Sequence, residues 1–529
     1  MKNFNKCEKI ALVRSLGMGG KMKKIIIDGK SLTIEKVVQI ARFGAKIELA
    51  EQAIKDVEES RKIVDRFVKN KETVYGITTG FGKFSDVTIS EEDTAQLQEN
   101  LIMSHACGVG NPLSNEIVKS IMILRVNNLS KGYSGVRLST LNVLVEMINK
   151  DVYPIVPEKG SLGASGDLAP LAHLVLVMLG KGEAIYEGVR MSGQEAMDKA
   201  GIKTTSLSAK EGLALINGTQ VMTAVGVITL YDAKMLMALS DISASLTIEG
   251  LKGITDAFDE RLHLVRPHPG QINTASNLLR ILEGSKLTTR QGELRVQDAY
   301  SLRCIPQIHG ASKDSISYIE SKVNIEINAV TDNPIIFKDT NEALSGGNFH
   351  GQPMALVFDF LKIALAEIAN SCERRIERLV NPSLSGLPAF LTKNGGLNSG
   401  FMIAQYSAAS LVSENKVLAH PASVDSIPSS ANQEDHVSMG TIAARQANEI
   451  LGNVMHVISI ELLAACQAID FDDNKKLGVG TRVAYDLVRK EVPVLEEDRV
   501  MNLDMNKVLK LITSHEIVNE VQKVIGKLD

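Results

Sequence analysis

Five consecutive residues, Gly163-Ala164-Ser165-Gly166-Asp167, have the types and order needed to build an electrophile from the main chain itself. If the Gly166 nitrogen attacks the Ala164 carbonyl and two waters leave, Ser165 becomes a dehydroalanine conjugated to a five-membered imidazolone ring. Glycine lacks Cβ, so its nitrogen can approach the carbonyl closely, and the small Ala164 leaves that carbonyl open. The methylene formed in this way would accept electron pairs, which no ordinary side chain does.

The same residues also fit an ordinary helix start. Asp167 can cap a helix that begins at Leu168, and Pro170 is tolerated in the first turn of such a helix. Ala-Ser-Gly is common in proteins whereas cyclisation is rare. The tripeptide alone therefore favours the helix start, and the choice between the two interpretations depends on the sequence around it.

The wider segment from Gly160 to His173 resembles the signature of the aromatic amino-acid ammonia-lyases, whose prosthetic group is methylidene-imidazolone (MIO). Further family-like blocks follow in chain order, at residues 75–82, 217–220, 297–303, 328–334, 346–351 and 433–436. The similarity runs from about Met22 nearly to the C-terminus. It implies that MIO forms autocatalytically from Ala164, Ser165 and Gly166, and that no dissociable cofactor is needed.

Elimination of ammonia from an α-amino acid explains why such a group is useful. The β-proton is weakly acidic and the amine is a poor leaving group, and acid–base catalysis contributes only roughly a hundred- to ten-thousandfold per group. An electrophile can capture the substrate amine or, alternatively, the aromatic ring. Both routes stay open, and we favour amine capture.

The resemblance implies roles for residues outside the cyclising motif. Tyr75, in a glycine-rich loop, would remove the β-proton. Many relatives carry Asn where this chain has Thr78, which weakens the assignment of other loop contacts but not of Tyr75. Arg303 would hold the substrate carboxylate through a bidentate pair, the geometry that a guanidinium matches best.

Four further positions complete the implied site. Asn217 and Tyr300 would position MIO and the substrate amine, Gln297 would support the same polar network, and Phe349 would pack beside the ring. Considered one at a time, Asn217 and Phe349 are more often a buried hydrogen-bonding residue and a core aromatic. Only the full set of blocks favours the functional interpretation.

Two positions indicate the substrate. The pair Ser104-His105 stands where phenylalanine-type members typically carry Phe-Leu and tyrosine-type members His-Leu. Glu434 stands where the phenylalanine type typically carries Gln. Both variants match the histidine-type members, which implies conversion of L-histidine to trans-urocanate and ammonia. A phenyl ring would leave a buried Glu434 unpaired, at a cost of roughly several kcal/mol. Glu434 could also exchange a proton with the imidazole during elimination.

Two alternatives remain open. The chain could be a phenylalanine or tyrosine ammonia-lyase or a 2,3-aminomutase of the same family, which its products would distinguish. It could also be a non-enzymatic helical scaffold, although the intact Ser165, Tyr75 and Arg303 argue against this.

Composition limits the partners and the compartment. The 529 residues carry a net charge of −4 with both signs interspersed, which argues against a nucleic-acid surface. The five cysteines are scattered without a CxxC pair, so we expect no disulfide framework or metal site and favour a cytoplasmic location. The longest charge-free run, residues 212–231, predicts a buried helix with functional polar groups rather than a membrane span.

Helical periodicity predicts the elements that hold these residues. Apolar spacing predicts a helix from Ile47 to about Phe67 and longer helices over 361–379, about 398–420 and about 438–471. Long helices poor in Gly and Pro bury their apolar stripes best against one another. We therefore expect a mainly α fold, in which a smaller mixed N-terminal part precedes an elongated bundle of long helices.

We expect three parts along the chain: a disordered extension over 1–21, an N-terminal globular part over 22–130, and an MIO-bearing helical part over 131–529. The short segment from Met22 to Gly29 predicts a strand and turn. The resemblance implies a homotetramer whose active sites combine residues from several subunits.

Overall fold

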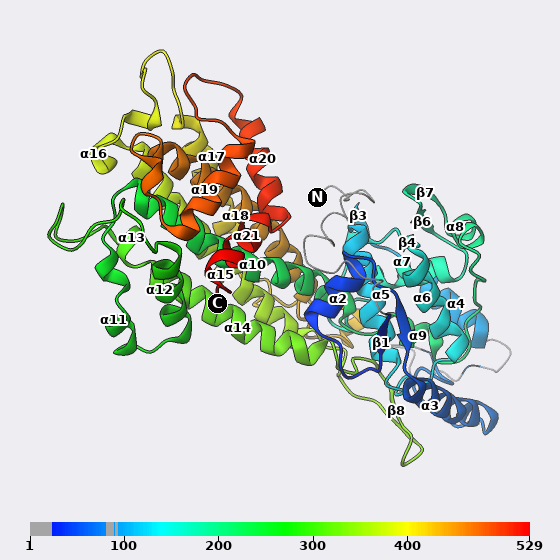
Figure 1. Ribbon diagram of the computed structural model, residues 1–529. Coiled ribbons are helices and arrows are strands. Elements are labelled where there is room, and N and C mark those ends of the chain that lie inside the picture. The colour runs from blue at the N-terminus through cyan, green and yellow to red at the C-terminus, as the bar shows by residue number, and fades with distance from the viewer. Residues whose placement is uncertain (1–23, 81–88, 90–93) are drawn as a thin grey trace. The chain divides into compact units, whose positions relative to one another are not determined.

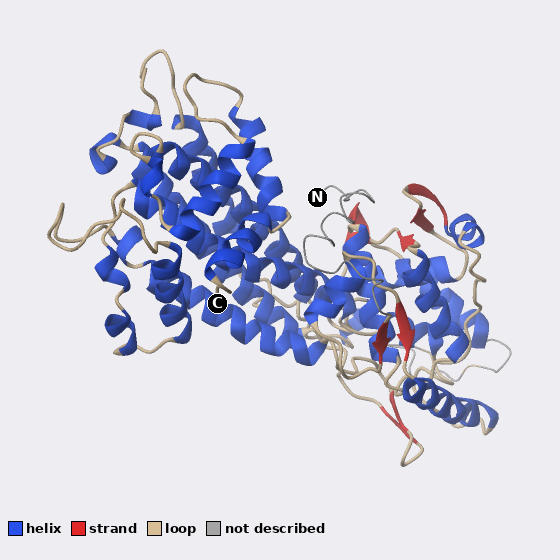
Figure 2. Ribbon diagram, viewed as in Figure 1, coloured by secondary structure: helices blue, strands red, loops and turns tan. Residues whose placement is uncertain are grey.

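The computed structural model describes residues 24–80, 89 and 94–529, and Figure 1 shows their elements in chain order. Two compact units make up the chain. The first comprises the residues up to Tyr231 with 320–359 and 421–445, and the second comprises 232–319, 360–420 and 446–529. Helices dominate both units and strands are few and short (Figure 2), so the predicted mainly α fold is confirmed. The expected extension over 1–21 lies outside the described residues, and the division near residue 130 stays a prediction.

The first unit begins with a small parallel sheet. Strand β1 (Ile25–Ile27), which confirms the predicted strand, pairs with β2 (Ile47–Leu49), and helix α2 (Ile34–Ala41) connects them. Helix α3 (Glu51–Lys69) therefore starts four residues later than predicted from Ile47. The apolar pattern of α3 extends back to Ile47 because Ile47 is also buried. Ile47 is buried as part of strand β2 and not as part of the helix.

Helix α5 (Asn115–Leu129) forms the interior of the first unit. Every residue from Ile117 to Leu129 is buried, including several polar and charged ones. A helix that is covered on all sides cannot place a charge in water, so each charged side chain must find its partners inside the fold. Lys119, for example, pairs with Asp151 at 2.5 Å.

Short helices and small sheets surround α5. They are α4 (Thr94–His105), β3 (Val109–Pro112), α6 (Leu138–Lys150), β4 (Tyr153–Pro154), β5 (Pro157–Lys159), α7 (Leu168–Met178), β6 (Glu183–Tyr186), β7 (Val189–Ser192), α8 (Gly193–Lys199), α9 (Glu211–Ile216), β8 (Ile335–Phe337) and β9 (Glu342–Leu344). The strands pair as β3 with β5, as β4-β6-β7, and as β8 with β9.

The charge-free run over 212–231 is buried as predicted but is not a single helix. Helix α9 ends at Ile216 and α10 (Gln220–Gly250) begins after a break at residues 217–219. Gly218 adopts φ +136° there, and a Cβ on it would lie 2.6 Å from Thr331 Oγ1. Its carbonyl accepts a hydrogen bond from Asp167 N at 2.8 Å. The helix is therefore interrupted where its main chain must pair with the cyclising motif.

Two described helices, α10 and α18 (Gly440–Ile469), are long and apolar enough to cross a membrane. Within the fold, 83% and 78% of their most apolar stretches are buried. Burial against other helices accounts for the apolar character of both, as expected for the central helices of a large core.

The second unit is built almost entirely from helices. The long predicted helices are confirmed as α15 (Gln352–Val380), α17 (Met402–Leu418) and α18. Its other helices are α11 (Glu260–Leu264), α12 (Pro269–Ile281), α13 (Tyr300–Arg303), α14 (Ile305–Glu326), α16 (Pro382–Ser385), α19 (Val479–Glu491), α20 (Met501–Thr513) and α21 (Glu516–Ile525). One end each of α10, α14, α15 and α18 belongs to the first unit and the rest of each helix to the second.

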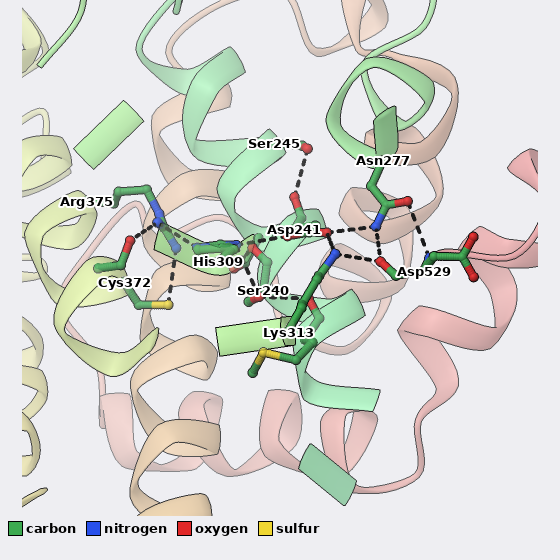
Figure 3. Close-up of polar contacts among 12 residues, drawn as sticks. Ser240, Asp241, Ser245, Asn277, His309, Lys313, Cys372, Arg375 and Asp529 are labelled. Atoms are coloured by element: carbon green, nitrogen blue, oxygen red, sulfur yellow. Dashed lines mark hydrogen bonds and ion pairs between the residues drawn. The ribbon is translucent and has the colours of Figure 1, made fainter. Parts of the chain in front are cut away.

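A chain of buried charged groups crosses the second unit (Figure 3). Asp241 accepts hydrogen bonds from Lys313 Nζ at 2.7 Å and from Asn277 Nδ2 at 2.9 Å, and its other oxygen lies 2.8 Å from His309 Nδ1. Arg375 contacts the far side of the same imidazole, with Nη1 3.3 Å from Nε2. Burying an unpaired charge costs several kcal/mol per ion, and direct partners of this kind offset that cost.

The neighbours of His309 determine its protonation. Arg375 can only donate, so Nε2 must accept, and the ring proton is therefore on Nδ1, where Asp241 accepts it. Burial lowers the pKa of His309, and the charges of Arg375 and Lys313 add to this, against the opposing charge of Asp241. The folded protein thus holds a neutral imidazole in the middle of a charged network.

This network predicts a loss of stability in mild acid. The pKa of His309 is lower in the folded chain than in the unfolded one, where it is about 6.5, so the unfolded state takes up the proton first. The stabilisation that depends on neutral His309 is fully present above that pH. Below it, the free energy of unfolding should fall by up to about 1.4 kcal/mol for each pH unit. Urea unfolding of wild type and His309→Gln from about pH 8 to about pH 5 measures the difference. The exposed His268 provides the control, and equal slopes for wild type, His309→Gln and His268→Gln would contradict the prediction.

Candidate active site

The cyclising motif lies in a tight loop between β5 and α7. Ala164 is buried and Gly166 adopts φ +74°, in the left-handed region that favours glycine. Gly166 also forms a parallel bridge with Gly218, and a Cβ on Gly166 would lie 2.2 Å from the Gly218 oxygen. Both the conformation and the close approach therefore require glycine at this position.

Asp167 anchors this loop, but not in the way that the helix-start interpretation predicts. It stands at the start of α7, yet its carboxylate makes no capping bond to that helix. It instead accepts from the first amides of α10, Val221 N and Met222 N, both at 2.9 Å, and from the hydroxyls of Ser161 and Thr441. The side chain is fully buried, and burial raises the pKa of Asp167 against the effect of these four donors.

A cavity of about 1300 Å³ opens in front of Ser165. It is formed by residues of the first unit, from segments far apart in the sequence. Six of the predicted site residues line it: Tyr75, His105, Ser165, Asn217, Phe349 and Glu434. The fold thus brings the hydroxyl of the cyclising motif and both substrate-indicating positions to one space.

Glu434 contacts Ser165 directly. The Ser165 hydroxyl donates to Glu434 Oε1 at 2.5 Å, and the Ser429 hydroxyl donates to Oε2 at 3.1 Å. The main chains of Ser429 and Glu434 also pair, through bonds of 2.9 and 3.3 Å. The carboxylate is therefore held from both sides at the wall of the cavity.

The turn that presents Glu434 has a strained backbone. Ser430, Ala431 and Asn432 adopt φ values of 50°, 52° and 65°, all in the left-handed region. This conformation costs a non-glycine residue roughly 1–2 kcal/mol, and such costs persist where the surrounding structure imposes them, often at functional sites. The strained turn and the pairing of Ser429 with Glu434 together fix the backbone that carries Glu434 at the cavity wall.

His105 is the last residue of α4 and lines the same cavity. Its Nδ1 lies 3.0 Å from the Ser104 hydroxyl. Burial lowers the pKa of His105, with an opposing contribution from the charge of Glu434. A neutral imidazole at this position has one nitrogen that donates and one that accepts.

Asn217 occupies the break between α9 and α10 and points at the cyclising motif. Its Nδ2 donates to the Ser165 carbonyl oxygen at 2.8 Å. Its Oδ1 is buried and has no hydrogen-bond partner among the described residues. An unpaired acceptor next to Ser165 costs about 1–3 kcal/mol unless a bound molecule satisfies it.

Tyr75 and Phe349 are both half-buried at the edge of the cavity. Thr78 closes the turn after Tyr75, because its hydroxyl donates to Glu72 O at 2.6 Å and accepts from Val74 N at 2.9 Å. The threonine that this chain has in place of asparagine is therefore accommodated by local hydrogen bonds. Residues 81 and 82 of the same glycine-rich block lie outside the described residues.

The remaining predicted residues, Gln297, Tyr300 and Arg303, belong to the second unit and do not line this cavity. Tyr300 is 69% exposed, which is unusual for a tyrosine, and the Arg303 guanidinium lies 4.6 Å from the centre of its ring. The two side chains of α13 therefore form a pair at the surface of that unit.

Comparison with known proteins identifies the family. A model of the family described as aromatic amino acid lyase matches residues 32–490. The histidine ammonia-lyase of Alkaliphilus oremlandii is 66% identical over 504 residues, which cover 95% of this chain and 99% of that protein. The chain belongs to the aromatic amino acid lyase family. This confirms the resemblance and, with it, the prediction of a carbon–nitrogen lyase.

Solved structures of aromatic amino acid lyases and their relatives have the same fold. The histidine ammonia-lyase from Trypanosoma cruzi aligns with a TM-score of 0.89 at 42% identity and covers 95% of both chains. The tyrosine aminomutase from Streptomyces globisporus aligns with a TM-score of 0.92 at 36% identity and covers 96% of this chain and 100% of that one. The fold is thus common to members that are named for different substrates and reactions, so the substrate must be argued from the cavity.

Sequence reasoning missed several residues that hold the site. The donors to Asp167 from α10 and from Thr441 were not predicted, nor was the contact of Ser429 with Glu434. A signal was present, because Thr441 is a buried polar residue in the first turn of α18, and Ser438 lies just before that helix. Buried polar groups of this kind need partners, which an apolar pattern does not reveal.

Proposed function

We propose that this lyase eliminates ammonia from L-histidine to give trans-urocanate, with MIO formed from Ala164, Ser165 and Gly166 as its electrophile. The observation that carries this proposal is the joint placement of His105 and Glu434 in the cavity in front of Ser165. Curated relatives named histidine ammonia-lyase, at 58 to 66% identity over nearly the full chain, support it.

The residues around the motif fit MIO. Gly166 has the space and backbone conformation that only glycine allows, and the Asn217 amide holds the Ser165 carbonyl oxygen. The unpaired Oδ1 of Asn217 adds an acceptor suited to the substrate ammonium group. When formed, MIO supplies an electrophilic methylene at the position of the Ser165 side chain, and Asn217 and Asp167 hold the loop that carries it.

We assign the imidazole of the substrate to the space between His105 and Glu434. Glu434 accepts one ring N–H, and the neutral His105 can donate to or accept from the ring, because burial lowers its pKa. A phenyl ring offers no such pairing, so one polar group would be left unsatisfied in the closed site, at a cost of about 1–3 kcal/mol. A phenol ring has a single hydroxyl at its far end and lacks the two ring nitrogens of the imidazole. This pairing favours histidine over phenylalanine and tyrosine.

Tyr75 is assigned as the base for the β-proton, and Phe349 packs beside the substrate ring. The substrate carboxylate is assigned to Arg303, with Tyr300 and Gln297 completing the polar network. Because these last three residues do not line the cavity of their own chain, we propose that a neighbouring subunit of a homotetramer supplies them. The exposed ring of Tyr300 is consistent with a contact of this kind.

We further propose a cytoplasmic location for this activity. The four described cysteines, Cys107, Cys304, Cys372 and Cys466, are free thiols. Burial raises the pKa of Cys466 to about 12, so this thiol is unreactive at neutral pH. Free thiols of this kind suit a reducing compartment.

The activity and the electrophile can be tested together. Purified protein incubated with L-histidine should release ammonia and a product with the absorbance of a conjugated acrylate. Its intact mass should be lower than the encoded mass by two waters. Ser165→Ala should fold, keep its full encoded mass and lose nearly all activity, because no side chain can then form the methylene. Active protein with an unmodified mass would rule out MIO, and a β-amino acid product would indicate an aminomutase.

Substrate preference should depend on His105 and Glu434 together. The double variant His105→Leu with Glu434→Gln should lose histidine activity and, with the cavity otherwise intact, gain detectable deamination of phenylalanine. Discrimination by buried polar pairing reaches roughly 10⁴-fold, so the change in kcat/KM should be large. The measurement is kcat/KM for histidine, phenylalanine and tyrosine in wild type and variant, and an undiminished histidine preference would refute the assignment.

A shared active site predicts complementation between two inactive chains. Glu434→Gln removes a group of the cavity, and Arg303→Ala removes the proposed carboxylate ligand, so each homotetramer should be nearly inactive. Co-expression should restore part of the activity, because some sites in mixed tetramers then receive both intact residues. As a control, Glu434→Gln mixed with His105→Leu should restore none, since both residues line the cavity of one chain. Equal recovery in the two mixtures would argue against Arg303 coming from a neighbour.

A further inference from the structure

Arg125 lies in the middle of α5 and is fully buried. Moving a guanidinium out of water costs several kcal/mol unless the interior repays it. A carboxylate partner usually offsets this cost, as Glu461 does for Arg375 in the second unit. No carboxylate of the described residues pairs directly with Arg125, although its position in the core offers no access to water.

The contacts of Arg125 are with the main chain of α9 and the break that follows it. Its Nη1 donates to Ala214 O at 3.1 Å and to Asn217 O at 2.9 Å. Its Nε and Nη2 are buried without a partner among the described residues. An arginine that contributed stability alone would be expected to use more of its five donors.

Arg125 retains its charge at this position. Burial lowers the pKa of Arg125 to about 10, and the carboxylates of Asp332 and Asp167 oppose this shift. Asp332 is itself paired with Lys210 at 2.7 Å, and both of these side chains are fully buried. A positive charge therefore remains behind Asn217 at neutral pH, where the surroundings screen it little.

The segment that Arg125 holds forms the support beneath Ser165. The Asn217 side chain reaches the Ser165 carbonyl oxygen, and Gly218 pairs with Gly166 and with Asp167 N. Because α9 stops at Ile216, helical hydrogen bonds do not fix the main chain of Asn217 on both sides. The hydrogen bond from Arg125 Nη1 to Asn217 O fixes the main chain at this point instead.

We propose that Arg125 is a positioning residue for the elimination, which holds the main chain of Asn217 so that its amide stays on the Ser165 carbonyl oxygen. The proposal rests on the function proposed above and names a residue outside the predicted site. A donor held at this oxygen stabilises negative charge on it, and the nearby guanidinium strengthens that donor. A shift of about 1 Å in such a group can cost on the order of a hundredfold in rate.

Arg61 provides a matched control in the same unit. Its Nη1 also donates to two main-chain carbonyls, Gly135 O at 3.1 Å and Ala209 O at 3.0 Å, and it is only 9% exposed. It makes no hydrogen bond to Ser165, Asn217 or Glu434. Arg61 also pairs with Asp65 at 2.6 Å, so Arg61→Lys removes at least as many contacts as Arg125→Lys. Both variants lose a guanidinium that donates to two main-chain carbonyls, in one case away from the cyclising motif and in the other beneath it.

The two lysine variants should differ in activity more than in stability. For each variant we would measure the thermal midpoint, the fraction of chains that has lost two waters by intact mass, and kcat and KM for histidine. Arg125→Lys should lower the fraction of cyclised chains, or kcat per cyclised chain by on the order of a hundredfold, with KM changed only a few-fold. Arg61→Lys should leave both quantities within a few-fold of wild type.

A double-mutant cycle tests whether Arg125 acts through Asn217. In an Asn217→Ala background, Arg125→Lys should lower kcat much less than it does in wild type, because the two residues serve one contact. Equal effects of Arg125→Lys in both backgrounds, or equal losses for Arg61→Lys and Arg125→Lys, would overturn the proposal. If the wild-type enzyme deaminates another amino acid and not histidine, only the histidine assignment is refuted. The Arg125 and Arg61 variants would then be compared on that other substrate.

Discussion

The carboxylate of Asp167 joins the parts of the chain on which the site depends. It sits at the start of α7, caps the first turn of α10 through two amides, and binds the hydroxyls of Ser161 and Thr441. A buried carboxylate without such donors would be strongly unfavourable, so these segments are held together by the need to satisfy it. The loop with Ser165 lies between them and takes its position from that requirement.

The glycine pair adds a second constraint of a different kind. Gly166 and Gly218 approach so closely that a Cβ on either would clash with main-chain or side-chain atoms. The bridge between them brings the end of α9 next to the cyclising motif, and this is why the helix breaks at Asn217. Polar anchoring by Asp167 and close packing of the glycines thus fix the same loop, one through charge and the other through shape.

Periodicity was sufficient to predict the long helices α15, α17 and α18, because their burial follows from local spacing. It failed at Ile47, where pairing with β1 decides that the residue is in a strand, and at Gly218, where contact with Asp167 interrupts a helical pattern. Both differences depend on residues far away in the sequence. The domain boundaries and the roles of the site residues stay predictions.

For the site, motif resemblance identified six residues that share one cavity, but not the groups behind them. Partners such as Thr441 and Arg125 contact main-chain atoms or buried carboxylates, and neither kind of contact leaves a pattern in the sequence. In the second unit, Asp241, His309 and Arg375 satisfy one another directly, as a network for stability would.

Beneath Ser165, by contrast, polar groups remain partly unsatisfied: Asn217 Oδ1 and two nitrogens of Arg125 have no partner among the described residues. Each such group costs about 1–3 kcal/mol, and the left-handed turn at 430–432 adds strain close to Glu434. Stability alone would favour replacing these groups. Their cost is consistent with preorganisation, because donors and acceptors that are already in place need not reorganise when charge develops in the cavity.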